Sequence, residues 1–125
     1  MPGQDPRGRV PGCAFCAVVA GREPAAVVRT WDDAVAIVPR RGGVAEGHLL
    51  VLSRKHVPDA GADPATTAAV MRRAAELMAG LPAANLITSK GAVATQTVFH
   101  LHVHVVPRAA DDGLALPWSP QADPS

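Results

Sequence analysis

The pattern of apolar and polar residues divides the chain into short apolar segments and one long amphipathic segment. The long segment, 63–79, repeats apolar residues at helical spacing, has Pro64 at its start and is followed by Gly80, so we expect a helix there. A shorter helix is expected over 13–20, before a glycine and a proline. Strands are expected where short runs rich in β-branched and apolar residues are bounded by turn residues, at 25–30, 34–38, 49–52, 85–88 and 99–106.

Strands joined by short turns, with only one long helix, predict the α+β class. We expect an antiparallel sheet of about five strands with one long and one short helix. A chain of 125 residues is sufficient for one domain with a real core. We place this domain at 12–118 and expect flexible tails at 1–11 and 119–125, where Pro, Gly and polar residues prevail.

Composition excludes several classes of partner. The formal net charge is +1 and the charges are scattered, which argues against a nucleic-acid-binding surface. No apolar run approaches the roughly 18 residues of a membrane helix, and the first residues lack the apolar core of a signal peptide. We therefore expect a cytoplasmic protein that binds neither nucleic acid nor membrane.

Three of the five histidines stand at alternate positions of the segment Phe-His-Leu-His-Val-His-Val-Val, residues 99–106. On a strand, His100, His102 and His104 would share one face, about 6.5 Å apart. Such a row can attack an electrophile, bind zinc or copper, or move protons near neutral pH, or it can simply lie exposed. The loop 89–95 is small and polar with one lysine and can bring N–H groups to an anion, so the combination indicates phosphoryl or nucleotidyl transfer.

Cys13 and Cys16 have a spacing that suits either a redox dithiol or two metal ligands. No strand–helix–strand pattern of a thioredoxin-like protein surrounds them, which favours the metal. His56 is a candidate third ligand, and one histidine of the row is a candidate fourth. Four such ligands form a closed, structural zinc site. His48, by contrast, is expected to be buried and bonded to the backbone.

Trp118 lies in an apolar tail of a chain with only 3% aromatic residues. A tryptophan between two prolines has little reason to be there unless it docks on a surface. That surface is either its own domain or a partner subunit, where the ring would wall the partner's substrate pocket.

Taken together, these residues resemble a known family. The run Gln-Thr-Val-Phe-His-Leu-His-Val-His-Val-Val-Pro, residues 96–107, resembles the signature of the histidine triad (HIT) family. In the same order along the chain, Cys-Ala-Phe-Cys at 13–16, Gly-His-Leu-Leu-Val-Leu-Ser-Arg-Lys-His at 47–56 and the segment 112–118 resemble parts of zinc-containing bacterial members. The likeness spans about residues 13–118.

The resemblance implies a HIT-like fold, a homodimer with a sheet continuous across the subunits, and nucleotidyl hydrolysis or transfer. The substrate would be a nucleoside phosphoramidate or a dinucleoside polyphosphate, with no organic cofactor. His102 would be the nucleophile that forms a nucleotidyl-histidine intermediate, and His104 would hydrogen-bond the phosphate or the leaving group.

The resemblance also implies binding roles. Gln96, Thr97 and Ser89 would contact phosphate, although an Asn commonly stands where this chain has Ser89. Phe15 and Val18 would line the base pocket. The zinc ligands would be Cys13, Cys16, His56 and His100.

Besides Ser89, a second feature departs from the family, because the stretch Val-Pro-Arg-Arg at 38–41 lacks the carboxylate that commonly holds the ribose. Two alternatives stay open: a nucleotide-binding module without turnover, and a metallohydrolase with catalytic zinc on the triad.

Overall fold

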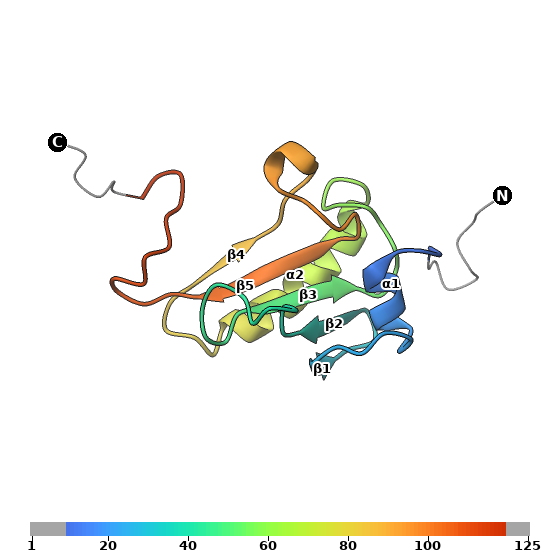
Figure 1. Ribbon diagram of the computed structural model, residues 1–125, viewed down its shortest axis with the longest axis horizontal. Coiled ribbons are helices and arrows are strands. Elements are labelled where there is room, and N and C mark those ends of the chain that lie inside the picture. Colours follow the sequence, from blue (N-terminus) through green and yellow to red (C-terminus); the bar gives the residue numbers. More distant parts are fainter. Residues whose placement is uncertain (1–9, 120–125) are drawn as a thin grey trace.

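The structure is a computed structural model that describes residues 10–119, and its centre is a five-stranded antiparallel sheet (Figure 1). The order across the sheet is β1-β2-β3-β5-β4. The elements are α1 (Ala14–Val19), β1 (Val27–Thr30), β2 (Ala34–Ile37), β3 (Leu49–Ser53), α2 (Pro64–Met78), β4 (Ala84–Ile87), the 3₁₀ turn η1 (Ala92–Ala94) and β5 (His102–Pro107).

This architecture confirms the predicted α+β class with its long and short helices. Neither α-helix of the described part has the length and apolar character needed to cross a bilayer. The predicted tails, 1–11 and 119–125, lie mostly outside the described residues.

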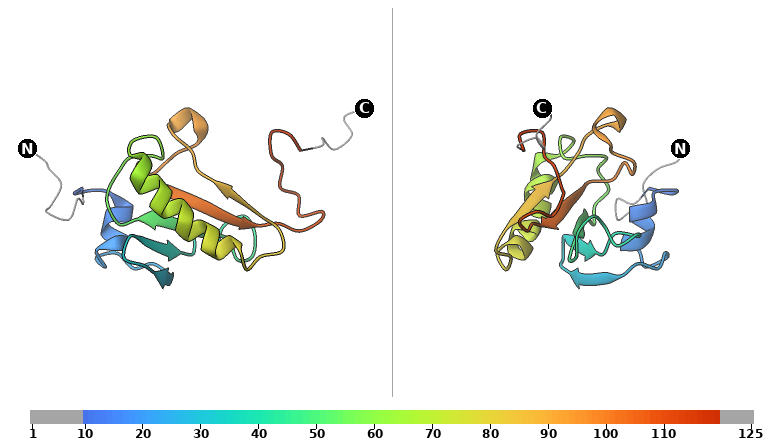
Figure 2. Two further views of the ribbon diagram at one scale, coloured as in Figure 1. Left: turned by 180° about the vertical axis from the view of Figure 1, so that it is seen from behind. Right: turned by 60° about the vertical axis from the view of Figure 1, so that its left-hand side comes forward.

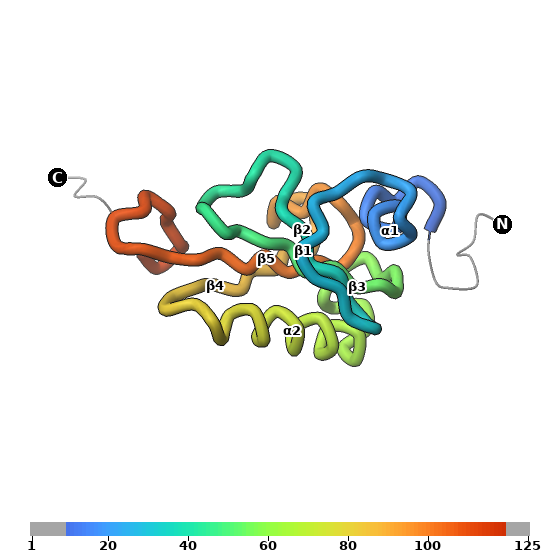
Figure 3. The backbone as a smooth tube through the Cα atoms, turned by 90° about the horizontal axis from the view of Figure 1, so that it is seen from below, coloured from blue at the N-terminus to red at the C-terminus, as the bar shows by residue number. Residues whose placement is uncertain are grey.

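The two helices lie on opposite faces of the sheet (Figures 2 and 3). On one face, Val70 and Ala74 of α2 pack against the buried side chains of the central strands, among them Val51, Val103 and Val105. On the other face, α1 packs over a smaller cluster on β2 and β3, formed by Phe15, Val18, Val19, Val35, Ile37, Leu50 and Leu52. Alternate residues of β2 and β3 therefore face different cores, as the period of a strand requires.

The long helix begins as predicted, with Pro64 in its first turn, and the structure shows Asp63 as its N-cap. The Asp63 carboxylate accepts hydrogen bonds from the Thr66 hydroxyl at 2.7 Å and from Nζ of Lys55 at 3.3 Å. The predicted apolar stripe is present, and Val70 and Ala74 are its fully buried members.

The last strand is shorter at its beginning than predicted, because it starts at His102 rather than at Phe99. Ahead of it, the Leu101 N–H donates to the Val57 carbonyl at 2.8 Å, and the Leu101 carbonyl accepts from the Ser53 N–H at 3.3 Å. These bonds hold the chain beside the end of β3, and His100 lies just before the strand.

Candidate active site and metal centre

His102 and His104 project from β5 on the face of the sheet that α1 covers. His102 lies opposite Leu52 of β3, and His104 lies opposite Leu50. Both leucines belong to the cluster under α1, so the two imidazoles stand beside that cluster. Their ring centroids are 5.3 Å apart, and both rings are half-buried.

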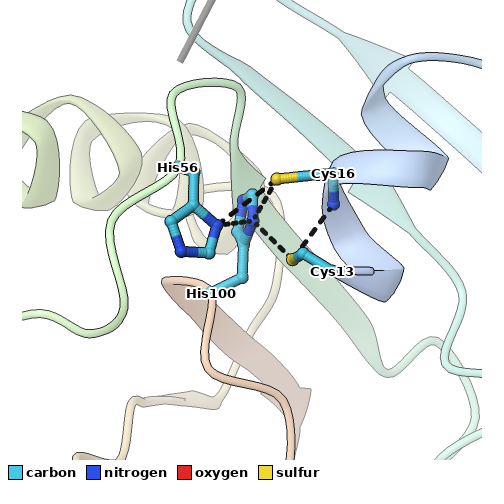
Figure 4. Close-up of side chains that lie close together, drawn as sticks. All are labelled: Cys13, Cys16, His56 and His100. Atoms are coloured by element: carbon cyan, nitrogen blue, oxygen red, sulfur yellow. Dashed lines mark hydrogen bonds between the residues drawn. The ribbon is translucent and has the colours of Figure 1, made fainter. Parts of the chain in front are cut away.

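The first triad histidine belongs to a different group. Nδ1 of His100 lies 3.4 Å from Sγ of Cys13, 3.5 Å from Sγ of Cys16 and 3.3 Å from Nδ1 of His56. Nδ1 of His56 lies 3.3 Å from Sγ of Cys16. Figure 4 shows the four side chains converging from α1, from the loop after β3 and from the segment before β5.

These separations match a tetrahedral zinc site. Zinc bonds of about 2.3 Å to sulfur and about 2.0–2.1 Å to nitrogen place S and N ligands roughly 3.5 Å apart and two N ligands roughly 3.3 Å apart. All four candidate ligand atoms lie within 4.8 Å of one another. The donor set, two thiolates and two imidazoles, is suited to zinc, and it is the set that the sequence predicted.

Groups around the four ligands hold them in position. Nε2–H of His100 donates to the Ser53 carbonyl at 2.6 Å, which leaves the Nδ1 lone pair for a metal. The Val10 N–H donates to Sγ of Cys16 at 3.3 Å, and the Cys16 N–H donates to Sγ of Cys13 at 3.4 Å. Such N–H···S contacts favour the thiolate form that binds metal.

The hydrogen bonds of the other two triad residues define their tautomers. Nδ1–H of His102 donates to the His100 carbonyl at 2.8 Å, so Nε2 carries the lone pair. The Thr88 hydroxyl donates to the backbone carbonyl of His102 at 2.8 Å and so anchors the strand at this residue. The bond to the His100 carbonyl holds the ring, and the Nε2 lone pair has a defined orientation. The sequence had not singled out Thr88.

His48 is buried and bonded to the backbone as predicted, and it also reaches the triad. Its Nδ1 accepts from the Val44 N–H at 3.0 Å, so its Nε2–H donates to Nδ1 of His104 at 3.0 Å. His104 therefore carries its proton on Nε2, ready to donate. Gly43, with φ of +78°, makes this possible, since a Cβ there would overlap the His48 ring.

Burial keeps this cluster of imidazoles neutral at pH 7. It lowers the pKa of His102 and of His48. The pKa of His104 is lowered to about 4, by burial first and then by repulsion from His102 and His48. Burial is also the main cause that lowers the pKa of His100 to about 4 and lowers that of His56. A neutral imidazole is the form that attacks phosphorus or binds a metal.

The residues expected at the phosphate lie on the loop between β4 and β5. Gln96 is buried, its Oε1 accepts from the Gly91 N–H at 2.8 Å and its Nε2 donates to the Pro58 carbonyl at 2.6 Å. Its amide thus fixes the shape of the loop in this structure. Ser89 is half-buried and Thr97 is exposed.

A cavity of about 840 Å³ opens between α1, the segment after it and the loop after β2. Phe15 and Val18 line it, together with Ile37 and Leu50. The Phe15 ring also packs edge-on against His102, with 5.1 Å between the ring centroids. The cavity therefore adjoins the His102 imidazole.

Trp118 is not part of this arrangement within the chain. It is 77% exposed, and the segment that carries it leaves the sheet at the end of β5 remote from α1 (Figure 1). Its docking on a partner subunit stays a prediction.

Comparison with known proteins agrees with the fold and the histidine row. The model of the HIT domain family matches residues 20–111. An uncharacterized HIT-like protein of Mycobacterium tuberculosis is 35% identical over 113 residues, covering 83% of this chain and 76% of the relative. The adenylylsulfatase HINT3 of Arabidopsis thaliana is 28% identical over 109 residues, which are 82% of this chain and 55% of that protein.

Among solved structures, a Zn-bound histidine triad family protein of Mycobacterium smegmatis superposes with a TM-score of 0.70. It is 34% identical, and the match covers 88% of this chain and 84% of the other. The α+β fold with an antiparallel sheet, and the row of histidines beside a Cys/His group, thus agree with the histidine triad proteins that the chain matches. The chain belongs to the HIT family, and its HIT-like fold is confirmed.

Proposed function

We propose that this protein is a nucleotidyl hydrolase or transferase that works through a covalent nucleotidyl-histidine intermediate on His102. The observation that carries the proposal is the tautomer of His102: its Nδ1–H is bonded to the His100 carbonyl, so the free lone pair is on Nε2. A neutral, oriented imidazole is a good nucleophile. It is also a good leaving group, because the ring carries a positive charge while bonded to phosphorus and departs as neutral imidazole.

The substrate class is a nucleotide whose phosphorus bears a leaving group, such as a nucleoside phosphoramidate or a dinucleoside polyphosphate. Nε2 of His102 attacks the phosphorus, the N–P bond forms and the bond to the leaving group breaks. Nε2–H of His104 hydrogen-bonds the departing atom, which takes its proton from a solvent water and leaves a hydroxide. A second water then attacks the phosphorus, the N–P bond breaks with Nε2 of His102 as the leaving atom, and the proton that this water loses neutralises the hydroxide.

His48 holds His104 in position for this step. Its Nδ1 accepts a hydrogen bond from the Val44 N–H, and its Nε2–H donates one to Nδ1 of His104. Ser89 and Thr97, with the N–H groups of their loop, are the proposed donors to the phosphate oxygens. Phe15 and Val18 are the proposed wall for the base.

We propose zinc as the metal of the Cys13, Cys16, His56 and His100 site, with a structural role. The four ligands close the coordination shell, and within residues 10–119 they are the one group of this kind. The zinc-bound M. smegmatis relative supports the assignment. A catalytic metal on the triad is disfavoured, because His102 and His104 lie outside the group.

A homodimer is the proposed assembly. β4 is an edge strand whose outer side has no partner among the described residues, so a second copy can continue the sheet there. The exposed Trp118 would then pack on the other subunit, where we propose that it walls the substrate pocket.

Trapping the intermediate tests the proposed chemistry. The protein is mixed with an adenosine 5′-phosphoramidate, quenched in alkali and digested, and the peptide containing 100–106 is analysed by mass spectrometry. We expect an adenylyl group on His102 in the wild type and none in His102→Ala. Binding without turnover would instead identify a nucleotide-binding module, and turnover that survives His102→Ala within tenfold would refute the mechanism.

A further inference from the structure

The rim of the cavity carries charged side chains that the proposed chemistry does not use. Arg22, Glu23 and Arg40 line the cavity, and all three are exposed. Within residues 10–119, neither arginine forms an ion pair or a side-chain hydrogen bond with the protein. Other arginines of the chain are paired, for example Arg73 with Asp33 at 2.9 Å and Arg108 with Asp112 at 2.8 Å.

The place of these arginines relative to the reacting atoms follows from the walls of the cavity. Phe15 lines the cavity and touches the His102 ring, and Leu50 lines it and lies opposite His104. A nucleotide whose phosphorus is at His102 therefore extends its nucleoside part along Phe15 and into the cavity. Arg22 and Arg40 line that cavity, so they border the space that the nucleoside would occupy.

The charge at the rim indicates what the nucleoside carries. Two guanidinium groups against one carboxylate leave an excess positive charge, and a guanidinium binds phosphate with paired N–H donors. The two hydroxyls of an unmodified ribose are neutral, so they require no cation. A phosphate monoester on the ribose carries negative charge, which two guanidinium groups can bind. Arg40 lies between Pro39 and Gly42, which also line the cavity, whereas Arg22 is next to the one carboxylate of the rim, Glu23.

We propose that Arg40, assisted by Arg22, recognises a second phosphate group on the ribose, at the 2′ or 3′ position. The substrates of this protein are then nucleotides phosphorylated on the ribose as well as at the 5′ position. This inference rests on the proposed function, since it takes the cavity to be the nucleoside site.

Equilibrium binding to the protein as isolated tests the proposal. The ligands are AMP, ADP, adenosine 2′,5′-bisphosphate and adenosine 3′,5′-bisphosphate, with the guanosine series in parallel and the tighter-binding base used for comparison. ADP has the phosphate count of the bisphosphates but carries both phosphates at the 5′ position. We expect one bisphosphate to bind about tenfold more tightly than the 5′-monophosphate and the 5′-diphosphate.

Variants assign the preference to the rim. Arg40→Gln should bring the ratio of bisphosphate to monophosphate affinity close to one, and Arg22→Gln should lower it by less. Arg41→Gln is the matched control, because Arg41 is an adjacent exposed arginine outside the cavity, and it should keep the ratio. The preference should also shrink between low and high salt, as screening of an exposed ion pair requires.

Two results would overturn the proposal. If the 5′-monophosphate binds and turnover of the phosphoramidate occurs, but neither bisphosphate binds more tightly, the ribose-phosphate site is wrong and the proposed function stands. Equal loss of the ratio in Arg40→Gln and Arg41→Gln leads to the same conclusion. If no nucleotide binds and no turnover occurs, the proposed function fails and this inference fails with it.

Discussion

Replacing the triad histidines one at a time separates the metal site from the chemistry. His100 and His102 are two residues apart, yet Nδ1 of His100 lies in the Cys/His group, whereas Nδ1–H of His102 donates to the His100 carbonyl and leaves the lone pair on Nε2. His100→Ala should therefore lose the metal and stability, whereas His102→Ala should keep both and lose activity. His56→Ala removes a ligand that is only half-buried, so it isolates the contribution of the metal.

The expected magnitudes follow from the contacts. A metal present at about a thousand times its dissociation constant stabilises the fold by about 4 kcal/mol. For a domain of this size that is roughly 12–20 °C in Tm. His100→Ala should lower the free energy of unfolding by roughly a further 1–3 kcal/mol. The ring is fully buried, and its loss removes the hydrogen bond to the Ser53 carbonyl. His102→Ala loses one bond to a carbonyl, about 1 kcal/mol.

The assays are zinc content after dialysis, Tm by circular dichroism, and turnover of a nucleoside phosphoramidate. Wild type and His102→Ala should contain about one zinc per chain, with Tm values a few degrees apart. His56→Ala and His100→Ala should contain little zinc and melt much earlier. Full zinc and an unchanged Tm in His100→Ala, or loss of zinc in His102→Ala, would refute the division of roles within the triad.

Three further predictions use other parts of the structure. Trp118→Ala should weaken dimerisation or substrate selection more than it lowers the Tm, which sedimentation and a substrate panel measure; a monomeric, fully active wild type would contradict this. Chelation should lower the Tm of the wild type but not that of His56→Ala, and an equal shift in both would mean that the chelator acts elsewhere. The free energy of unfolding should fall as the pH drops from 6.5 toward 4, because the unfolded state takes up a proton on His104 that the folded state, with a pKa of about 4, resists. The fall should be shallower in His104→Asn, and an identical slope would contradict the cause.

The sequence predicted most of the elements because each has a local signal. Pro64 and the apolar stripe identify α2, and alternating or continuous apolar runs identify the strands. The start of β5 was missed for a physical reason. Phe99, His100 and Leu101 have the composition of a strand, but the Leu101 N–H is bonded to the Val57 carbonyl. Local propensity does not contain that contact.

The candidate site was predictable as far as residue spacing reaches. Cys13 and Cys16 indicated half of a zinc site, and His56 was a reasonable third ligand. The spacing did not say which triad histidine would be the fourth, and the structure assigns His100. The contact between His48 and His104 was not predictable, because it depends on the register that pairs Leu50 with His104 and on the Val44 N–H that fixes the His48 ring, and local sequence patterns contain neither.

The position of α1 explains why a protein whose proposed chemistry uses no metal would keep a metal site. A helix of six residues, with only Cys16 and Val19 buried, is far too short to be stable by itself. Yet this helix carries Phe15 between the two cysteines, and the Phe15 ring packs on both His100 and His102 and lines the cavity. A metal held by Cys13, Cys16, His56 and His100 would join the start of this helix to the loop after β3 and to the segment before β5, and would so hold Phe15 against His102. It would then set the distance between the cavity and the proposed nucleophile without taking part in any step at phosphorus.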